Sequence, residues 1–277
     1  MVKIISDSTC DLSPDIQKNY DIEVVPLSIY VNGRNYQDGI NLNTSQLFDL
    51  IEQSNQLPKT SAPAIETYQQ VFNKYQELIY ISISSQLSAS YQSSMLALEG
   101  TDPEKKIVID SLNLSTGIGL LALKASELSK QGLSATEIAE YIRKDVPKVR
   151  TSFVIDTLDF LYKGGRCSAI ELLVGSLLKI HPVIEVRADG TLGVKEKIGG
   201  SRKKALGSLI SDLQSKLSQV DPHRIFVTHC SCLSDADYLK QEISNLSYFD
   251  DILITEAGST IASHCGPKTI GILYMMK

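Results

Sequence analysis

The sequence predicts an α/β protein of two domains, with a parallel sheet in residues 1–148 and a mixed sheet in residues 149–277. In the first part, short apolar runs alternate with segments of helical periodicity, which is typical of a parallel sheet covered on both faces. This pattern changes near Pro147, where we place the domain boundary. In the second part, Ala188-Asp189-Gly190 lies between two β-rich runs and indicates a hairpin, so part of the second sheet is antiparallel.

In the first part, β-rich runs predict strands at residues 2–5, 22–25, 27–31, 78–83 and 107–110. Asn32-Gly33 is a strong signal for a two-residue turn, followed by a further short extended segment. Helical spacing of apolar residues predicts helices at residues 44–54, 64–75, 88–98, 116–130 and 134–146.

In the second part, we expect a strand at residues 153–155 and then a short helix at 158–162 that ends at Gly164-Gly165. The hairpin strands are expected at residues 183–186 and 192–194. Amphipathic spacing predicts helices at 202–217 and 234–246, and apolar runs predict strands at 225–228, 252–255 and 270–275.

The composition is that of an ordinary globular protein, with 43% apolar and 21% charged residues. A net charge of −5 argues against a general nucleic-acid binder. No apolar run approaches the ~20 residues that span a bilayer, and no secretory signal is recognisable at the amino terminus. Five cysteines without a repeated spacing fit a reducing compartment. We therefore expect a cytoplasmic protein and, by default, a monomer.

Three hydroxyl-rich segments predict a site for an anionic group: Ser6-Asp7-Ser8-Thr9, Lys59-Thr60-Ser61-Ala62-Pro63 and Ser84-Ser85-Gln86-Leu87-Ser88. The first and third follow predicted strands and precede predicted helices, a geometry that directs backbone N–H groups and hydroxyls at a carboxylate or phosphate. The alternative is that these residues only cap helices. Because the pattern recurs and no Walker-type loop or nucleophile elbow is present, we favour binding of the acidic end of a small molecule.

Histidine and cysteine residues are the next candidates. His264 lies in Ser263-His264-Cys265-Gly266-Pro267, which we interpret as a loop that either offers the imidazole to an anion or bonds it to nearby backbone. His229, Cys230 and Cys232 provide too few ligands for a metal site, so we interpret them as packing at a strand end. We expect no metal and no cofactor.

Two arginines are also candidates. Lys163-Gly164-Gly165-Arg166 indicates either an exposed corner that presents Arg166 or a helix C-cap with basic residues near the helix dipole. Arg202, at the start of a predicted helix, is either a solvated charge or an anion contact.

Taken together, these strings resemble the DegV family of bacterial fatty-acid-binding proteins, nearly from end to end. Any single string is weak, but their order and spacing carry the resemblance. Besides Lys59-Thr60-Ser61-Ala62-Pro63, Lys163-Gly164-Gly165-Arg166 and Ser263-His264-Cys265-Gly266-Pro267, the matching strings are Ser6-Asp7-Ser8-Thr9-Cys10-Asp11-Leu12, Val25-Pro26-Leu27, Tyr36-Gln37-Asp38-Gly39, Ile109-Asp110-Ser111, Leu178-Lys179-Ile180-His181-Pro182 and Asp189-Gly190.

The resemblance implies a two-domain protein that encloses a long-chain fatty acid in a buried tunnel, with the carboxylate in the interdomain region. It implies carboxylate contacts from Thr60, Ser88 and His264, and a further contact from Arg202; we add Ser61 from its place beside Thr60. Arg166 resembles a docking residue for a separate ATP-dependent kinase, which phosphorylates the bound acid to an acyl-phosphate. One departure is that Ala89-Ser90 replaces the family's usual Gly-Thr.

On this interpretation the protein is a substrate-presenting subunit rather than an enzyme. The alternative is a small-molecule enzyme, such as a hydrolase or a polyol-kinase-like protein, that uses Ser88 or His264 directly. A regulatory protein that senses acyl supply would differ only in its partner. A co-purifying long-chain acid would favour the carrier, whereas turnover without added protein would favour the enzyme.

Overall fold

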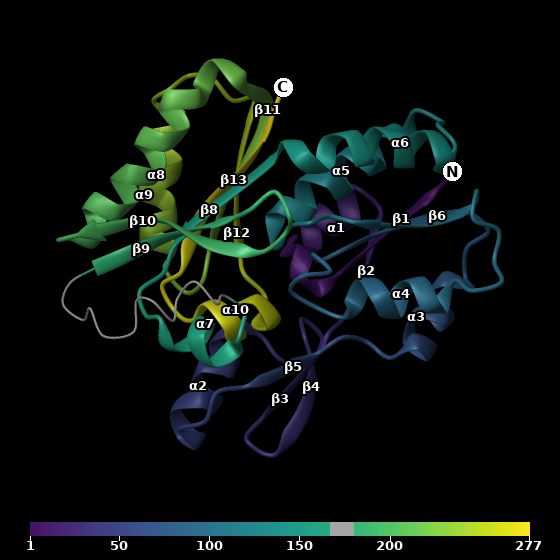
Figure 1. Ribbon diagram of the computed structural model, residues 1–277, viewed down its shortest axis with the longest axis horizontal. Coiled ribbons are helices and arrows are strands. Elements are labelled where there is room, and N and C mark those ends of the chain that lie inside the picture. Colours follow the sequence, from purple (N-terminus) through teal and green to yellow (C-terminus); the bar gives the residue numbers. More distant parts are fainter. Residues whose placement is uncertain (167–179) are drawn as a thin grey trace.

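The computed structural model describes residues 1–166 and 180–277, which form a two-domain α/β fold (Figure 1). The first domain contains a parallel sheet with the strand order β2-β1-β6-β7. Its strands are β1 (Lys3–Asp7), β2 (Ile22–Val25), β6 (Leu78–Ser82) and β7 (Lys106–Asp110). The parallel sheet predicted from the alternating pattern is therefore confirmed.

Helices cover both faces of this sheet, α5 and α6 on one side and α3 and α4 on the other (Figure 1). The strand β6 shows why, because Tyr80 packs with Tyr68 and Phe72 of α3, while Ile79 and Ile81 belong to the cluster under α5. The helices of the domain are α1 (Pro14–Asn19), α2 (Thr44–Ser54), α3 (Ile65–Phe72), α4 (Ser90–Ala97), α5 (Thr116–Lys130) and α6 (Ala135–Asp145). A strand buried on both faces reads as a continuous apolar run, as the sequence showed.

The first domain also contains a small antiparallel sheet, of which the sequence predicted the β3–β4 hairpin but not the third strand, β5. It has the order β4-β3-β5, with β3 (Ser28–Val31), β4 (Arg34–Gln37) and β5 (Lys59–Ser61). The predicted Asn32-Gly33 turn is confirmed, and both residues have positive φ (48° and 75°), as a tight hairpin requires. Pairing of β5 with β3 places Thr60 opposite Ile29.

The second domain is built on a mixed sheet with the order β10-β9-β8-β13-β11-β12. Its strands are β8 (Val149–Val154), β9 (Ile180–Val186), β10 (Leu192–Gly199), β11 (Val220–His229), β12 (Asp251–Glu256) and β13 (Ile270–Met276). The predicted hairpin is confirmed as β9–β10, but β8 begins earlier than expected, because Val149 already pairs with Met275. Pro147 lies in the 3-10 turn Val146–Lys148, between α6 and β8. Leu178 and Lys179 lie outside the described residues.

The helices of the second domain are α7 (Asp159–Gly164), α8 (Arg202–Lys216), α9 (Leu233–Ser244) and α10 (Ser259–Cys265). Helices α8 and α9 lie side by side on one face of the mixed sheet (Figure 1). In the described ranges, no helix is both long and apolar enough to span a bilayer.

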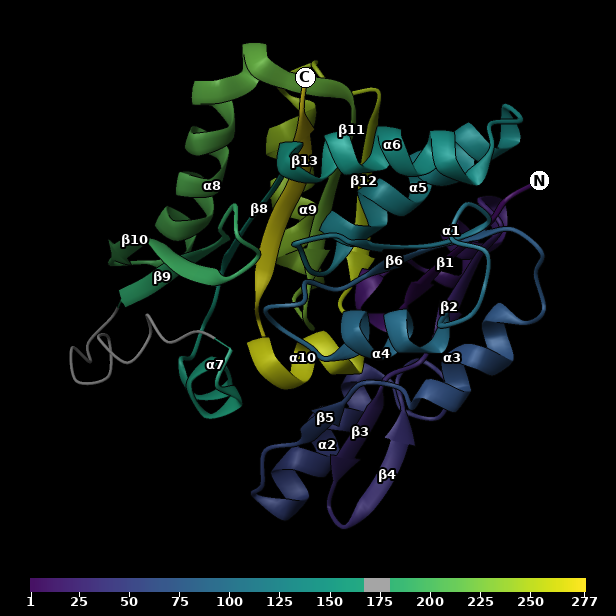
Figure 2. The same ribbon diagram turned by 45° about the vertical axis from the view of Figure 1, so that its right-hand side comes forward.

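Helix α5 joins the two domains, because it contacts β1 and β6 of the first sheet and β8, β11 and β13 of the second (Figure 2). Two glycines in its first turn allow this close approach. A Cβ atom on Gly117 would lie 2.2 Å from Oδ1 of Asn113, and one on Gly119 would lie 2.8 Å from Cδ2 of Leu12. Gly117 and Gly119 thus serve helix packing.

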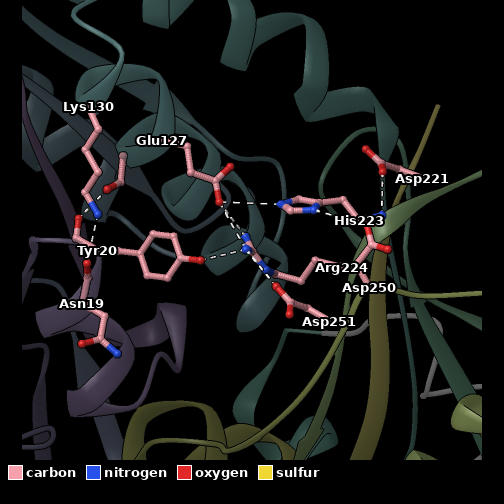
Figure 3. A network of polar contacts seen from close by, with 10 residues as sticks. Asn19, Tyr20, Glu127, Lys130, Asp221, His223, Arg224, Asp250 and Asp251 are labelled. Atoms are coloured by element: carbon pink, nitrogen blue, oxygen red, sulfur yellow. Dashed lines mark hydrogen bonds and ion pairs between the residues drawn. The ribbon is translucent and has the colours of Figure 1, made fainter.

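A polar network also links the domains near the C-terminal end of α5 (Figure 3). The guanidinium of Arg224 on β11, only 6% exposed, donates to Oε1 of Glu127 (3.2 Å), the hydroxyl of Tyr20 (2.8 Å) and Oδ2 of Asp251 (3.3 Å). Because one buried cation serves residues of both domains, the network holds the domains in a fixed relation at this edge.

Candidate functional site

A cavity of about 250 Å³, here called the interdomain cavity, lies between β5, the turn after β6, α7 and α10. Apolar side chains form most of its wall, and hydroxyl, imidazole and guanidinium groups are also present. It is lined by Leu27, Thr60, Ser61, Ala62, Ile83, Leu87, Ser88, Ala89, Leu114, Leu161, Arg166, Leu192, Thr260, Ile261, His264 and Cys265. Residues of both domains therefore form the site, including Thr60, Ser61, Ser88, Arg166 and His264, which the sequence singled out.

The central polar contact joins Oγ1 of Thr60 to Nε2 of His264, 2.7 Å apart. Thr60 is held by the pairing of β5 with β3, and His264 lies in the last turn of α10. The prediction that His264 lies on a loop is wrong: residues 259–265 form a helix, and Gly266 (φ 78°) follows it. This short helix was missed because its first backbone N–H groups are held by side chains distant in sequence.

The imidazole of His264 is held neutral. Burial, and to a smaller extent the nearby charge of Arg166, lower the pKa of His264 to about 4. Nδ1 is buried without a hydrogen-bond partner against Gly164, where a Cβ atom would lie only 2.7 Å from it. We assign the single proton to Nε2, since a buried N–H without an acceptor is costly. Nε2 then donates to Thr60, and the Thr60 hydroxyl keeps its own proton for a ligand.

Ser88 lies in the turn before α4 and is held by Ser90. The two hydroxyl oxygens are 2.9 Å apart, and the backbone N–H of Ser90 donates to Oγ of Ser88 (3.2 Å). Ala89, where the resemblance implies a glycine, has φ −75°, so no glycine is required there. Ser90 was not predicted as a site residue, although the sequence shows this second hydroxyl two positions after Ser88.

Arg166 follows the C-cap of α7, where Gly165 has φ 68°, so the helix C-cap interpretation is confirmed. Its Nη1 donates to the carbonyl oxygen of Gly164 (2.6 Å), and its Nε donates to that of Leu87 (3.4 Å). Arg166 is exposed, and its guanidinium bonds the carbonyl oxygens of two turns at the rim of the cavity that Thr60 and Ser88 also line.

The structure does not bring Arg202 to this cavity. Its Nε donates to Oδ2 of Asp235 (2.7 Å) and its Nη2 to the carbonyl oxygen of Lys268 (2.5 Å), at the start of α8. This is a correction to the prediction of a carboxyl contact. The guanidinium is occupied in joining α8 to α9 and to the segment before β13.

The first hydroxyl-rich segment does not line the cavity either. Ser6 donates to the carbonyl oxygen of Ile81 (2.8 Å), and Thr9 bonds the buried carboxylate of Asp7, so both stabilise the parallel sheet. The second segment is itself the antiparallel strand β5, not the carboxyl end of a parallel strand. In the third segment, Ser84 donates to the carbonyl oxygen of Gly190 (2.9 Å), and Ser88 lines the cavity.

A smaller cavity of about 30 Å³, here called the inner cavity, adjoins the first and shares Leu114, Ile261 and Cys265 with it. The hydroxyls at its wall are hydrogen bonded to protein groups. Thr151 donates to Oδ1 of Asn113 (2.7 Å), and Thr228 bonds Thr116 at 2.6 Å. The two cavities meet at these three shared residues, and each has both apolar and polar groups in its wall.

The family model for an uncharacterised protein of the DegV family matches residues 1–277. The chain belongs to the DegV family. A DegV domain-containing protein of Clostridium acetobutylicum is 32% identical to it over 280 residues, with 100% of this chain and 99% of that protein covered.

Solved structures of DegV proteins share this fold over the whole chain. A fatty-acid-binding DegV family protein of Thermus thermophilus has a TM-score of 0.92 and 26% identity, covering 100% of this chain and 99% of that one. DegV of Bacillus subtilis, a fatty-acid-binding protein, has a TM-score of 0.88 and 28% identity, covering 100% and 99%. The fatty acid kinase B3 protein of Streptococcus pneumoniae, loaded with linoleic acid, has a TM-score of 0.88 and 28% identity, covering both chains in full.

Proposed function

We propose that this DegV protein binds a long-chain fatty acid in the interdomain cavity, with the carboxyl group at Thr60, Ser88 and His264. The observation that carries the proposal is the Thr60–His264 hydrogen bond at the polar end of an otherwise apolar cavity. Two solved relatives are described as fatty-acid-binding, and a third holds linoleic acid.

The donors suit a carboxyl group in a site of low dielectric. Burying a carboxylate without partners is costly, so several donors must converge on it. Thr60 and Ser88 supply hydroxyls, and Ser61 lies beside them. None of these contacts requires a cofactor.

The tail would lie along the apolar wall and contribute about 0.8 kcal/mol for each CH₂ removed from water. The interdomain cavity, at about 250 Å³, lies below the roughly 300–1,000 Å³ of typical ligand pockets. We therefore propose that the tail continues into the inner cavity and displaces the side chains of Leu114 and Ile261, which separate the two.

We also propose that the protein presents the bound carboxyl group to a separate ATP-dependent kinase for acyl-phosphate formation, with Arg166 as a docking residue. The exposure of Arg166 at the cavity rim supports this. Cysteines 10, 230, 232 and 265 are free thiols, which supports a cytoplasmic location where ATP is available. We retain the expectation of a monomer.

Direct catalysis by Ser88 and His264 has less support. A serine nucleophile needs a base within hydrogen-bond reach, but the partner of the His264 ring is Thr60 and the partner of the Ser88 hydroxyl is Ser90. Binding a fatty acid uses these same contacts and needs no nucleophile–base pair.

Native mass spectrometry of the purified protein tests the first step, and we expect a co-purified or added long-chain acid at one per chain. The second step is tested by adding a bacterial fatty acid kinase and ATP and measuring acyl-phosphate. Failure to bind any long-chain acid would overturn the binding proposal. Turnover without the kinase would restore the enzyme alternative.

A further inference from the structure

Helix α10, which carries His264, begins against the first domain rather than against its own sheet (Figure 2). Oδ1 of Asp38 accepts the backbone N–H of Ser259 (2.8 Å), and Oδ2 of Asp38 accepts that of Thr260 (3.2 Å). Oδ1 of Asp11 accepts the N–H of Gly258 (2.8 Å). Two carboxylates of the first domain therefore satisfy consecutive N–H groups at the start of α10, which would otherwise lack partners.

Two hydroxyl hydrogen bonds, one in each direction between the domains, complete this attachment. Thr44 donates to the carbonyl oxygen of Ala257 (2.6 Å), and Ser259 donates to that of Leu42 (3.3 Å). Asp38 is itself fixed, since its N–H donates to the carbonyl oxygen of Leu27 (3.0 Å) and it pairs with Leu42 in a β-bridge. The carboxylate is only 3% exposed, so water does not compete for these bonds.

The geometry links Asp38 to the polar end of the cavity. Helix α10 has seven residues, and His264 lies five positions after Ser259, about 7.5 Å along the helix axis at 1.5 Å per residue. Leu27, which accepts the N–H of Asp38, lines the interdomain cavity itself. A helix of two turns moves as a unit, so a shift at its first turn reaches the imidazole.

We propose that Asp38 is a positioning residue for carboxyl recognition, holding the start of α10 so that Nε2 of His264 meets the hydroxyl of Thr60. The inference rests on the proposed function and gives a role to Tyr36-Gln37-Asp38-Gly39, a string to which the sequence assigned none. Asp11 assists by accepting the neighbouring backbone N–H of Gly258. A carboxylate is needed because both of its oxygens accept, whereas an asparagine would turn an NH₂ group toward one of the two N–H donors.

The test uses Asp38→Asn in the full-length protein, with Asp145→Asn as the matched control. Asp145 is equally buried, at 4% exposed, but it pairs with Lys124 (2.6 Å) and Lys148 (3.0 Å) beside α6, away from the cavity. We expect Asp38→Asn to weaken palmitate binding about tenfold, the equivalent of one hydrogen bond, and Asp145→Asn to change it by less than about twofold.

A double-mutant cycle with Thr60→Val separates positioning from general destabilisation. If Asp38 acts through the His264–Thr60 contact, Asp38→Asn will cost little further affinity in the Thr60→Val background. An equal loss in both backgrounds would overturn the proposal. The cycle requires that the wild-type protein binds the acid. If it does not bind, the proposed function itself is rejected, and this outcome is distinct from an equal loss in both backgrounds.

The positioning role of Asp38 can also be tested in the protein without ligand. Nitrogen-15 NMR of the His264 ring should show the Nε2–H tautomer with a hydrogen-bonded proton in the wild type. We expect this signature to be lost in Asp38→Asn and kept in Asp145→Asn. Should Asp38→Asn fail to fold, Thr44→Val removes a neighbouring bond to the segment before α10 without burying a new donor. An unaltered ring signal in folded Asp38→Asn, or in Thr44→Val where Asp38→Asn does not fold, would overturn the inference.

Discussion

Nε2 of His264 lies 2.7 Å from Oγ1 of Thr60, although 204 positions separate the two residues in the sequence. One side chain comes from a strand of the first domain and the other from a helix of the second. The polar end of the interdomain cavity thus exists only while the two domains are in contact. Changes to either residue are therefore expected to act on the carboxyl group of a ligand and much less on its tail.

Thr60→Val removes the hydroxyl but keeps the branched shape that β5 accommodates. We expect affinity for a long-chain acid to fall by about 1.5–3 kcal/mol, the range for a hydrogen bond to a charged group. Isothermal titration calorimetry with palmitate measures the change. Thr60→Ser, which keeps the hydroxyl, is the control and should remain within about threefold of wild type. Equal affinity of Thr60→Val and wild type would remove Thr60 from the site.

His264 makes the stability of the ligand-free protein depend on pH in a defined direction. Its pKa of about 4 lies below the ordinary 6.5, so between these values the unfolded chain binds more protons than the folded one. Above pH 6.5 the ring is neutral in both states, so its titration does not reduce the free energy of unfolding. As the pH falls from 6.5 toward 4, the free energy of unfolding decreases by up to about 1.4 kcal/mol per pH unit. Urea unfolding from pH 7 to 4.5 should show a steeper loss for wild type than for His264→Gln.

If His264→Gln has the same slope as wild type, the imidazole titrates normally in the folded state and our assignment of a buried neutral ring is wrong.

Arg166→Ala distinguishes docking from carboxyl binding. If Arg166 serves the kinase, acid affinity should change by less than about threefold, while acyl-phosphate yield with added kinase falls about tenfold or more. Titration calorimetry and a coupled ATP assay measure the two quantities. Arg166→Lys keeps the charge and should recover part of the yield. A large loss of acid affinity with an unchanged yield per bound acid would assign Arg166 to the carboxyl group instead.

Gly271→Ala tests the packing of β13 against β8 at the wall of the inner cavity. A Cβ atom there would lie 2.8 Å from Cβ of Phe153 and 2.9 Å from the carbonyl oxygen of Ser152. We expect overpacking to cost about 1–3 kcal/mol of unfolding free energy. Gly207→Ala in α8, where a Cβ meets nothing within 4 Å, should instead stabilise the protein by up to about 1 kcal/mol. Urea denaturation of both variants measures the two changes. An unchanged free energy of unfolding in Gly271→Ala would mean that β13 and β8 move apart at little cost.

Arg224 offers a test of the interdomain network. Arg224→Met should destabilise the protein by about 1–3 kcal/mol, less than for a fully buried pair, because Glu127 and Asp251 are partly exposed and regain water. Thermal unfolding measures this change. An apparent split of the transition into two steps would show that Arg224 also couples the domains. No change in either the midpoint or its sharpness would contradict a linking role.

Local patterns predicted the regular elements well, because their signals are short-range. The bounds of α5 match the expected residues 116–130, and Asn32-Gly33 and Ala188-Asp189-Gly190 both lie in hairpins. Thr60, Ser88 and His264, which line the interdomain cavity, were singled out through strings of sequence and a family resemblance. By contrast, β5 and α10 were missed, since three residues of strand and seven of helix carry little periodicity of their own.

The sequence by itself determined the alternation of strands and helices, the turns and the polar strings, because propensity and periodicity act between near neighbours. Only the tertiary structure decided which of those strings meet. It brought Thr60 to His264 and left Arg202 with Asp235. Asp38 caps a helix that begins 221 positions later, in a structure where both domains pack against α5. Such contacts follow from the packing of buried surfaces, which no short stretch of sequence encodes alone.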